Sequence, residues 1–539
     1  MRFLAGESLS DKMYGILIKI GKLSCKGIEK VWQGWLLAKA FSRRRRVRVC
    51  ACVAVLSIAS LTVTIMTHIP RSQWPSYQRR QNYSVGVVKE SAIGKDATVS
   101  VRQAFLHEEP SLNMVSGSEV PAVRTVKKGE VFKVLSERED WYLLQLSLTG
   151  DSAWVKSHCM TVEGQGPKPP AGVKKPESIT GGELGQNLVE ICRGGQCSAV
   201  ACAAAVIKDG EVAYTYEFGV INKYRQNKVT VDTKFRIGTL SAFTTMMGVM
   251  TLEQSAKLSL EDELESYMHY PVRNPRFPGV PINMRHLLTN TTGLKDTELV
   301  AKGSNEGAPL RTLLGRKNFF FSIEPDNGWS LSSSGFGVAG AAVEKVADVA
   351  FSDYMDVALF APLGMNATYD ASTFSEEDQM MVADCYMAGK GTPERSRELL
   401  VKEKKINDLG ENFYTANANC FISAKDLGTL VAILASDGGY GGQEVILPTA
   451  IKKIETIHYR AEGLNQCLAL RYGENMYDGR SLFYLCGGMY GVRAMVAYDK
   501  ENRCGVAVIT NGAISSEDEF GNYTACSAII EEIFVSGLI

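Results

Sequence analysis

The sequence predicts a chain that combines a large α/β domain with a small all-β barrel and one N-terminal transmembrane helix. Three observations support this prediction: an apolar run behind a basic leader, then short apolar alternations broken by Gly, Pro and Ser, then a long stretch of mixed α and β patterning. The chain has 539 residues, enough for roughly two to four domains. Its composition, 45% hydrophobic and 22% charged, predicts packed cores rather than disorder.

Shifts in composition along the chain predict the boundaries of these parts. The segment EGQGPKPPAGVKKPESITGGELG is rich in Pro, Gly and Lys without apolar periodicity, which is typical of an interdomain linker. The predicted parts are a basic leader at 1–48, a transmembrane helix at 49–66, a polar spacer at 67–86, a β-barrel at 87–162, the linker at 163–185 and the α/β domain at 186–539.

The apolar run VCACVAVLSIASLTVTIM, residues 49–66, contains no charged side chain. At about 1.5 Å per residue, a helix of this length just spans a hydrocarbon core of about 30 Å. The basic cluster RRRRVR precedes the run, so the N-terminus should lie on the cytosolic or matrix-equivalent side and the later domains on the opposite side. A cleaved signal peptide is the alternative, but the leader and the run are both too long for it. We therefore expect a single-pass membrane protein with an uncleaved signal-anchor.

The zero net charge of the chain hides an uneven distribution. Residues 1–48 carry twelve Lys and Arg against three Asp and Glu, a net of +9, so the rest of the chain carries −9. The positive charge lies beside the apolar run, which favours contact with a membrane surface and argues against a nucleic-acid partner. The leader fits either a surface helix on an anionic membrane or an organelle address.

Thirteen cysteines are present, and ten of them follow the apolar run, where an oxidising compartment would permit disulfides. Cys192 and Cys197, in CRGGQC, are the pair favoured by proximity, although spacing alone does not establish pairing.

The region from 87 to 162 has short alternating apolar segments, which are typical of a small all-β unit. Its order VR…P…VKKGEVFKVLSEREDWYLLQL…GDSAWV resembles bacterial-type SH3 domains, with Trp141 and the closing Trp154-Val155 strand at matching places. The resemblance implies that the unit binds peptides or cell-wall fragments. A plain β-barrel spacer fits the same pattern equally well.

Six landmarks in the last part of the chain occur in a fixed order. They are FRIGTLSAFTTMMGVMTLEQSAKLSLEDELESYM, INMRHLLTNTTGL, WSLSSSGFGVAGAAVEKVA, LFAPLGMNAT, FISAKDLGTLVAILASDGG and YLCGGMYGVRAMVAYDKENRCGVAVITN. Together they resemble the serine beta-lactamase, penicillin-binding protein and DD-peptidase superfamily, in its class C and esterase-like branch. The resemblance implies an antiparallel sheet flanked by helices, with a helical subdomain beside it.

The resemblance also implies where the catalytic residues would lie. The superfamily attacks a carbonyl with the serine of a Ser-x-x-Lys motif, because a hydroxyl needs a base one helical turn away. Here Thr239 occupies the serine position and Ala242 the lysine position. The neighbouring Ser241 has Thr244 at its own i+3 position, so the motif has not simply shifted.

Two further motifs of the superfamily have also lost their proton-moving groups. The Tyr-x-Asn or Ser-x-Asn motif corresponds to Leu331, Ser332 and Ser333, of which Leu331 transfers no proton and Ser333 is a short substitute for the amide. The strand motif that supplies Lys or His reads Cys486-Gly487-Gly488, and its glycines still allow a ligand to approach the backbone.

A rebuilt hydrolase site is the main alternative. It would use Thr239 or Cys486 as the nucleophile of an esterase or peptidase, but no His lies near Cys486 in sequence. The His of the LLtH landmark is replaced by Asn290, and His286 is more consistent with a capping or packing role. A small buried thiol is the ordinary interpretation of Cys486, because thiols in apolar strands are usually inert.

The sequence predicts no cofactor and no metal. GFGVAG, residues 335–340, matches G-x-G-x-x-G but follows a Ser run instead of an apolar strand, which argues against dinucleotide binding. The six histidines are scattered, without the spacing of a zinc site.

Taken together, the sequence predicts a membrane-anchored pseudoenzyme that acts as a binding or scaffold protein. Its degenerate positions are Thr239, Ala242, Leu331, Ser333 and Cys486, and its candidate ligand-binding groove comprises Thr239, Ser333, Cys486, Gly487 and Gly488. A peptide-like or protein ligand, self-assembly, and a peptidoglycan-bound receptor are the expected kinds of interaction.

Overall fold

The computed structural model describes residues 91–110, 122–147, 150–166, 170–195, 197–296, 309–401, 408–411, 413–514 and 516–539. These all belong to the second of two compact units, Met1–Ser84 and Val85–Ile539. The predicted leader, transmembrane helix and spacer lie outside the described residues. Among the helices that are described, none has the length and apolar character needed to cross a membrane.

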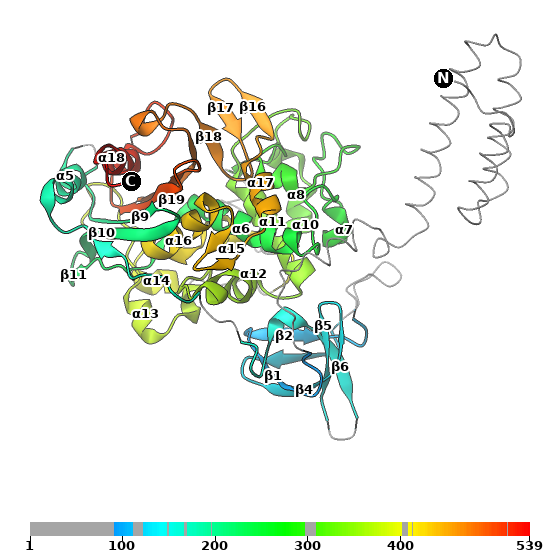
Figure 1. The fold of residues 1–539 in the computed structure, drawn as a ribbon. Helices are drawn as coiled ribbons and strands as arrows, with labels where there is room; N and C mark the ends of the chain where they lie inside the picture. The colour runs from blue at the N-terminus through cyan, green and yellow to red at the C-terminus, as the bar shows by residue number, and fades with distance from the viewer. Residues whose placement is uncertain are drawn as a thin grey trace, which may run out of the picture. The chain divides into compact units, whose positions relative to one another are not determined.

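The region from 91 to 162, called the small β unit below, is built from short antiparallel strands (Figure 1). Five of them form one sheet in the order β6-β5-β4-β1-β7, and β2 pairs with β3 separately. Their bounds are β1 Asp96–Val99, β2 Gln103–Leu106, β3 Arg124–Lys127, β4 Val131–Arg138, β5 Trp141–Gln145, β6 Ser152–Lys156 and β7 Met160–Val162. In β4, Phe132 and Val134 are buried while their neighbours are exposed, as strand alternation requires. The all-β character predicted for this region is confirmed, and the likeness to bacterial-type SH3 domains stays a prediction.

The large domain contains a ten-stranded sheet in the order β11-β10-β9-β21-β20-β19-β18-β17-β16, with β8 pairing in parallel beside β10. The other pairs are antiparallel, as the resemblance implied. The bounds are β8 Glu177–Ser178, β9 Ala201–Lys208, β10 Glu211–Asn222, β11 Asn227–Lys228, β16 Tyr459–Ala461, β17 Leu464–Gln466, β18 Arg471–Gly473, β19 Leu482–Met489, β20 Val492–Asp499 and β21 Cys504–Asn511.

Helices cover the central strands of this sheet on both faces. Helices α5 (Gly182–Arg193) and α18 (Thr524–Val535) pack together and bury one apolar cluster against β9, β20 and β21. Helix α16 (Ala424–Ala435) packs against β9 and β21 on the other face, where it joins the main core (Figure 1). The central strands β9 and β21 are buried almost throughout, which explains their continuous apolar runs.

The structured part of the large domain begins before residue 186. Strand β8 and the first residues of α5 lie within the segment predicted to be a linker. Ile179 and Leu184 anchor this segment, because both pack against the cluster beneath α5 and α18. Two apolar residues among so many Pro, Gly and Lys are too few to produce a recognisable periodicity.

The helical subdomain is centred on α6 (Ser241–Gln254), which is buried nearly all round and follows the short helix η3 (Gly238–Leu240). Helix α11 (Ser333–Ala347) packs against both α6 and α15 (Tyr414–Ala418). The remaining described helices include α7 Glu265–Met268, α8 Met284–Leu288, α10 Leu310–Leu314, α12 Phe351–Met355, α13 Glu376–Met380, α14 Arg397–Val401 and α17 Pro448–Glu455. Two short strand pairs complete it, β12 Phe235–Arg236 with β13 Phe421–Ile422 and β14 Gly439–Tyr440 with β15 Gln443–Glu444.

The predicted Cys192–Cys197 pair is present as two free, buried thiols. The Cys192 thiol lies in hydrogen-bonding contact with both Cys197 and Cys202, and hydrogen bonding to Cys192 together with burial raises the pKa of Cys197 far above its ordinary value.

Candidate functional site

Thr239, which is predicted to match the superfamily nucleophile, lies in η3 directly beside the end of β19. Its Oγ1 accepts a hydrogen bond from the backbone N–H of Gly488 at 3.0 Å and donates to the Gly488 carbonyl at 3.4 Å. The O–H donor and one acceptor site of the hydroxyl are therefore both used by one residue of the strand. The hydroxyl links η3 to β19, a structural role that uses the atom a nucleophile would need.

Two glycines allow this close approach. A Cβ on Gly487 would clash with Leu240 N and lie 2.8 Å from Thr239 Oγ1. A Cβ on Gly238 would lie 2.5 Å from the carbonyl carbon of Gly488, and the φ of +57° at Gly238 also favours glycine. The structure thus brings Thr239, Gly487 and Gly488 together. The absence of a side chain at Gly238 and Gly487 is needed for η3 to pack on the strand.

Ala242 occupies the first turn of α6, three residues after Thr239, and is buried. Its methyl group has no atom that could accept a proton from Thr239. Ser241 offers no replacement, because its Oγ donates to the Gly238 carbonyl at 2.6 Å and accepts from Cys420 N–H at 3.1 Å.

The positions of the second superfamily motif lie at the start of α11. Leu331 is 61% exposed, so an apolar group faces solvent at the position predicted to match the superfamily's hydroxyl. The hydroxyls of Ser332 and Ser333 donate to the carboxylate of Asp296 at 3.0 and 2.8 Å. The hydroxyl of Ser333 is therefore already paired within the chain.

Asp296 is a residue that sequence reasoning did not find. Its carboxylate also accepts from the backbone N–H groups of Ser333 and Ser334, both at 2.9 Å. A carboxylate at a helix N-terminus satisfies orphan N–H groups and complements the helix dipole, so Asp296 stabilises α11. Asp296 is too far from α11 in sequence for a local capping signature to show it.

Asn290, which is predicted to match the landmark His, has a structural role. Its φ of +59° places it in the left-handed region, and its Oδ1 accepts from Ser332 N–H at 3.0 Å. Its backbone carbonyl accepts from Ser330 N–H at 2.9 Å. Asn290 therefore holds the segment that leads into α11.

Cys486 lies on β19 opposite Met495 of β20, and its side chain belongs to the cluster beneath α18. Successive side chains of a strand point to opposite faces, so Cys486 faces away from the side where Gly487 meets Thr239. Its Sγ accepts a hydrogen bond from Tyr523 N–H at 3.4 Å, and burial raises its pKa to about 12. The structure thus separates the Cys486 side chain from the other predicted groove residues, and the thiol is protonated at neutral pH.

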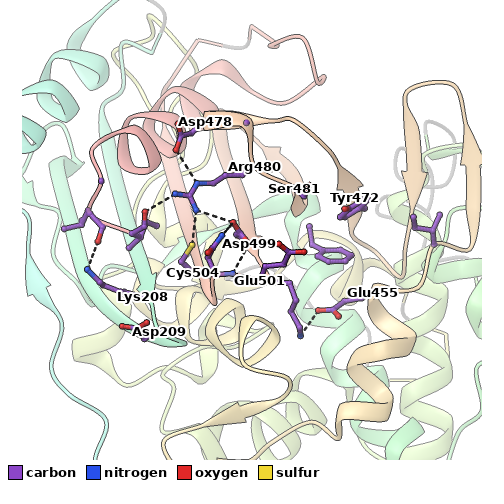
Figure 2. A pocket seen from close by; sticks show the side chains of 18 residues that line it. Lys208, Asp209, Glu455, Tyr472, Asp478, Arg480, Ser481, Asp499, Glu501 and Cys504 are labelled. Carbon is purple, nitrogen blue, oxygen red and sulfur yellow. Dashed lines mark hydrogen bonds and ion pairs between the residues drawn. The ribbon is translucent and has the colours of Figure 1, made fainter.

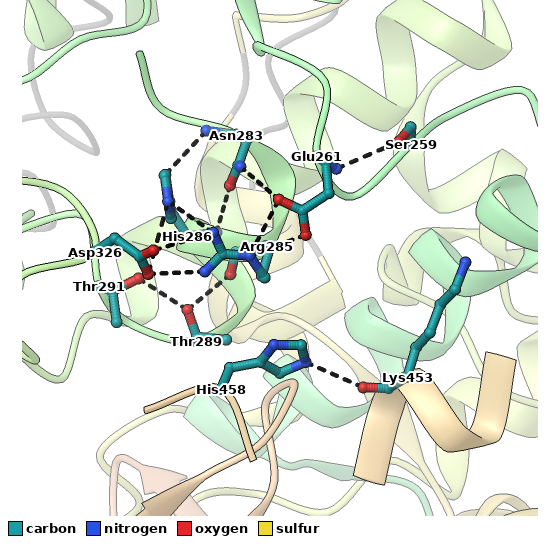
Figure 3. Close-up of polar contacts among 10 residues, drawn as sticks. All are labelled: Ser259, Glu261, Asn283, Arg285, His286, Thr289, Thr291, Asp326, Lys453 and His458. Atoms are coloured by element: carbon teal, nitrogen blue, oxygen red, sulfur yellow. Dashed lines mark hydrogen bonds and ion pairs between the residues drawn. The ribbon is translucent and has the colours of Figure 1, made fainter. Parts of the chain in front are cut away.

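His286 forms a capping box at the start of α8, in agreement with the capping role considered from the sequence (Figure 3). Asn283 N–H donates to its Nδ1 at 3.3 Å, and Asn283 Oδ1 accepts from His286 N–H at 2.9 Å. Burial and the adjacent Arg285 lower the pKa of His286 to about 4. Arg285 in turn binds Asp326 at 2.8 Å and Glu261 at 3.0 Å. His286 is therefore a neutral structural residue.

A cavity of about 950 Å³ lies away from these positions (Figure 2). It is lined by the start of β19, the end of β20 and the last residues of the chain, whereas Gly487 and Gly488 lie near the other end of β19. Two of its cations are paired with acidic residues: Arg480 binds Asp499 at 3.2 Å, and Lys500 binds Glu455 at 3.0 Å. None of the residues predicted for the groove lines this cavity. Across the described ranges, no group of three or more His, Cys, Asp and Glu is arranged to hold a metal ion.

Comparisons with known proteins agree with the sheet-and-helix architecture of the large domain. The Beta-lactamase family model matches residues 187–526. Penicillin-binding protein 4* of Bacillus subtilis (strain 168) is 25% identical over 169 residues, which cover 30% of this chain and 35% of that protein. Esterase EstB of Burkholderia gladioli is 26% identical over 215 residues, which cover 37% of this chain and 53% of that protein. The chain thus spans about a third and about half of the lengths of these two relatives.

Solved structures share the fold at lower sequence identity. An octameric penicillin-binding protein homologue from Pyrococcus abyssi aligns with a TM-score of 0.51 and 21% identity, covering 66% of this chain and 76% of that one. A class C beta lactamase from Rhodobacter sphaeroides aligns with a TM-score of 0.51 and 17% identity, covering 66% of this chain and 99% of that one.

Proposed function

Because the chain belongs to the Beta-lactamase family through residues 187–526, we propose that it is a pseudoenzyme of that family which acts as a binding or scaffold protein. Two of its relatives carry the names of a penicillin-binding protein and an esterase, so the family background is hydrolytic. In this chain the groups that move protons have been replaced, while the residues that build the fold remain.

The bonding of Thr239 is the observation that carries the proposal. Acyl transfer needs a hydroxyl that is free to attack and a base that takes its proton. Here the hydroxyl is bonded to the backbone of Gly488, and the residue one turn along α6 is Ala242. The pairing of Ser333 with Asp296 supports the same conclusion at the second motif.

The alternative nucleophile is disfavoured by its surroundings. Cys486 is on the face of β19 opposite Gly487, and a pKa of about 12 keeps its thiol protonated at neutral pH. A hydrolase that used Cys486 would need a base able to ionise it beneath α18.

We further propose that the predicted helix at 49–66 anchors the chain as a single-pass membrane protein, with the small β unit and the large domain on the side opposite the N-terminus. In this arrangement the small β unit is the SH3-like part, and the large domain offers its surface to a protein or peptide-like ligand or to other copies of the chain.

Active-site labelling tests the central proposal. The full chain would be treated separately with a fluorophosphonate, a beta-lactam and a maleimide, beside the variants Thr239→Ala and Cys486→Ala. We expect no stoichiometric labelling by the first two reagents, and maleimide labelling of native protein that does not depend on Cys486. Stoichiometric acylation that is lost in Thr239→Ala, or a modified Cys486 in the native protein, would overturn the proposal.

The assembly form of the proposal has a separate test. The molar mass of the full chain in detergent would be measured by light scattering over a hundredfold range of concentration. A mass that rises with concentration to a defined oligomer supports a scaffold that self-assembles. A constant monomeric mass leaves binding of a different partner as the proposed role.

A further inference from the structure

Arg102 of the small β unit binds three side chains of the large domain. Its Nε donates to Asp353 Oδ1 at 2.8 Å, its Nη1 to Asp370 Oδ2 at 2.7 Å and its Nη2 to Ser352 Oγ at 2.6 Å. The side chains of Asp353 and Asp370 are only 11% and 3% exposed. Removing the guanidinium would leave two poorly solvated carboxylates without this cation, which is a costly change.

A second polar contact joins the end of β2 to the end of α11. His107 Nε2 lies 2.7 Å from Asp348 Oδ2, and these side chains are 4% and 13% exposed. Asp348 is the C-cap of α11 and has a φ of 57°, a conformation that Asp tolerates better than most residues. The His107 ring also meets the Trp141 ring edge to face, with 5.6 Å between centroids.

The turn between β4 and β5 makes a third contact. The Asp140 carboxylate accepts from Lys156 Nζ at 2.9 Å, and Lys257 of the large domain approaches it to 3.5 Å. Although burial acts to raise the pKa of Asp140, the two lysines hold it below its ordinary value. On the helix that follows β6, the His158 ring meets Tyr354 edge to face with 5.7 Å between centroids.

Apolar packing continues through the same contact. Val99 and Cys159 of the small β unit belong to the same buried cluster as Phe351 and Met355 of α12. Burial lowers the pKa of His158 to about 3, so its ring is neutral where it packs. Apolar packing therefore accompanies the polar contacts, while the cations Arg102 and Lys257 stay partly exposed at its edge.

We propose that the small β unit is a fixed intramolecular partner of the corner formed by the end of α11 and α12, and that it unfolds together with the large domain. The surface that it uses, made by Arg102, His107, Asp140 and His158, thus binds this chain itself. A ligand-binding module that acts independently would need this surface free. This role goes beyond the proposed function and does not depend on whether the large domain is catalytic.

Charge complementarity explains why the corner is the partner. The small β unit contributes the cation Arg102, the corner contributes the acceptors Asp348 and Asp353, and Asp370 is a further acceptor beyond α12. At Asp140 the charges are the other way round: the small β unit contributes the carboxylate and the large domain contributes the cation Lys257. Such an arrangement defines a register, because a shifted contact would bring like charges together.

Hydrogen exchange measured on the full chain tests the proposal directly. Peptides from 131–145 report on the small β unit, peptides from 351–360 on the corner, and peptides from 424–435 on the core of the large domain. We expect the most protected amides of the first and third regions to exchange at the same denaturant concentration. A small β unit that loses protection at clearly lower denaturant than α16 would overturn the proposal.

A set of variants isolates the charged contact. Arg102→Ala should raise exchange about tenfold in both 131–145 and 351–360, because it leaves the nearly buried carboxylates of Asp353 and Asp370 without this half-exposed cation, and a tenfold change corresponds to about 1.4 kcal/mol. Arg124→Ala, which removes an exposed arginine of the same unit, is the matched control and should change neither region. Arg102→Lys should give an intermediate effect and remains measurable if the alanine variant folds poorly.

The pairing itself is checked by a double-mutant cycle. Asp353→Ala combined with Arg102→Ala should cost clearly less than the sum of the two single changes, because the two side chains share one contact. Equal effects of Arg102→Ala and Arg124→Ala, or strict additivity of the two single changes, would contradict the proposal.

Discussion

Ser333 and Asp296 are joined by two hydrogen bonds, from the Ser333 N–H at 2.9 Å and from its hydroxyl at 2.8 Å, to the same carboxylate oxygen. The sequence predicts that Ser333 matches the position of an amide that orients the substrate in the superfamily. In this structure the serine is paired with Asp296 and contributes to the start of α11.

Asp296→Ala should lower the free energy of unfolding by about 1–3 kcal/mol, because it leaves buried donors at the start of α11 without an acceptor. Urea denaturation followed by circular dichroism measures this difference. The matched control is Asp232→Ala, which removes an exposed carboxylate paired with Lys425 and should cost less than about 1 kcal/mol. Equal losses in the two variants would contradict the capping role of Asp296.

Gly487→Ala should destabilise the protein by about 1–3 kcal/mol, because the added methyl group would clash with Leu240 and Thr239 where η3 packs on β19. Thermal unfolding measured by calorimetry reports the change. Gly279→Ala, where an added Cβ meets nothing within 4 Å, is the control and should leave the melting temperature nearly unchanged. A Gly487→Ala protein as stable as the control would mean that η3 and β19 are not in direct contact.

Glu344 should make stability fall as the pH rises from about 5 to 8. Burial raises the pKa of this carboxyl to about 7, above its ordinary value of 4.5, so the folded state holds the proton more tightly than the unfolded state. The contribution of Glu344 to the free energy of unfolding is complete below the pKa that this group has in the unfolded chain. The contribution is lost as the pH rises through about 7, by at most about 1.4 kcal/mol per pH unit. The carboxylate also accepts from Phe351 N–H and Gly410 N–H, both at 2.9 Å.

The variant Glu344→Gln cannot ionise and should remove this part of the pH dependence. Urea midpoints of both proteins would be measured at several values between pH 5 and pH 8. The two profiles should diverge as the pH increases, with the wild-type protein losing more stability. Parallel profiles would show that Glu344 does not titrate in this range.

The thiols of Cys192, Cys197 and Cys202 should form one disulfide when the protein folds in the presence of oxidised glutathione. Cys192 contacts both of the other thiols. If glutathione forms a mixed disulfide with one cysteine of a contacting pair, the thiolate of its neighbour can attack that disulfide with little movement and release glutathione. Mass spectrometry of alkylated, unreduced peptides identifies the pair. Cys159 and Cys420, buried elsewhere, serve as internal controls and should remain reduced. Complete alkylation of all three clustered thiols after such folding would contradict the prediction.

Some features of the site could be predicted from the sequence because they depend on short spacings. The relation of Thr239 to Ala242 follows from the pitch of one helix, so the predicted lack of a base depends only on the identities of these two residues. The antiparallel sheet and the buried helix after Thr239 follow from ordered landmarks that extend over most of the large domain. The capping role of His286 also depends on a residue only three positions away.

Other features depend on strand pairing and on contacts between distant segments. The pairing of β19 with β20 and its packing against η3 decide that Gly487 faces Thr239 while Cys486 faces α18. No pattern within YLCGGMYG indicates which of the two faces meets the helix.

The sequence by itself determined the family, since the ordered landmarks are properties of residue identity and local spacing. The order of the parts and the loss of the proton-moving groups stay predictions. Only the tertiary structure decided that Asp296 pairs with Ser333, that Thr239 is bonded to the Gly488 backbone and that Arg102 binds Asp353. The reason is physical: a hydrogen bond between residues far apart in the chain forms only after folding has brought both partners together and excluded the water that would otherwise compete for them.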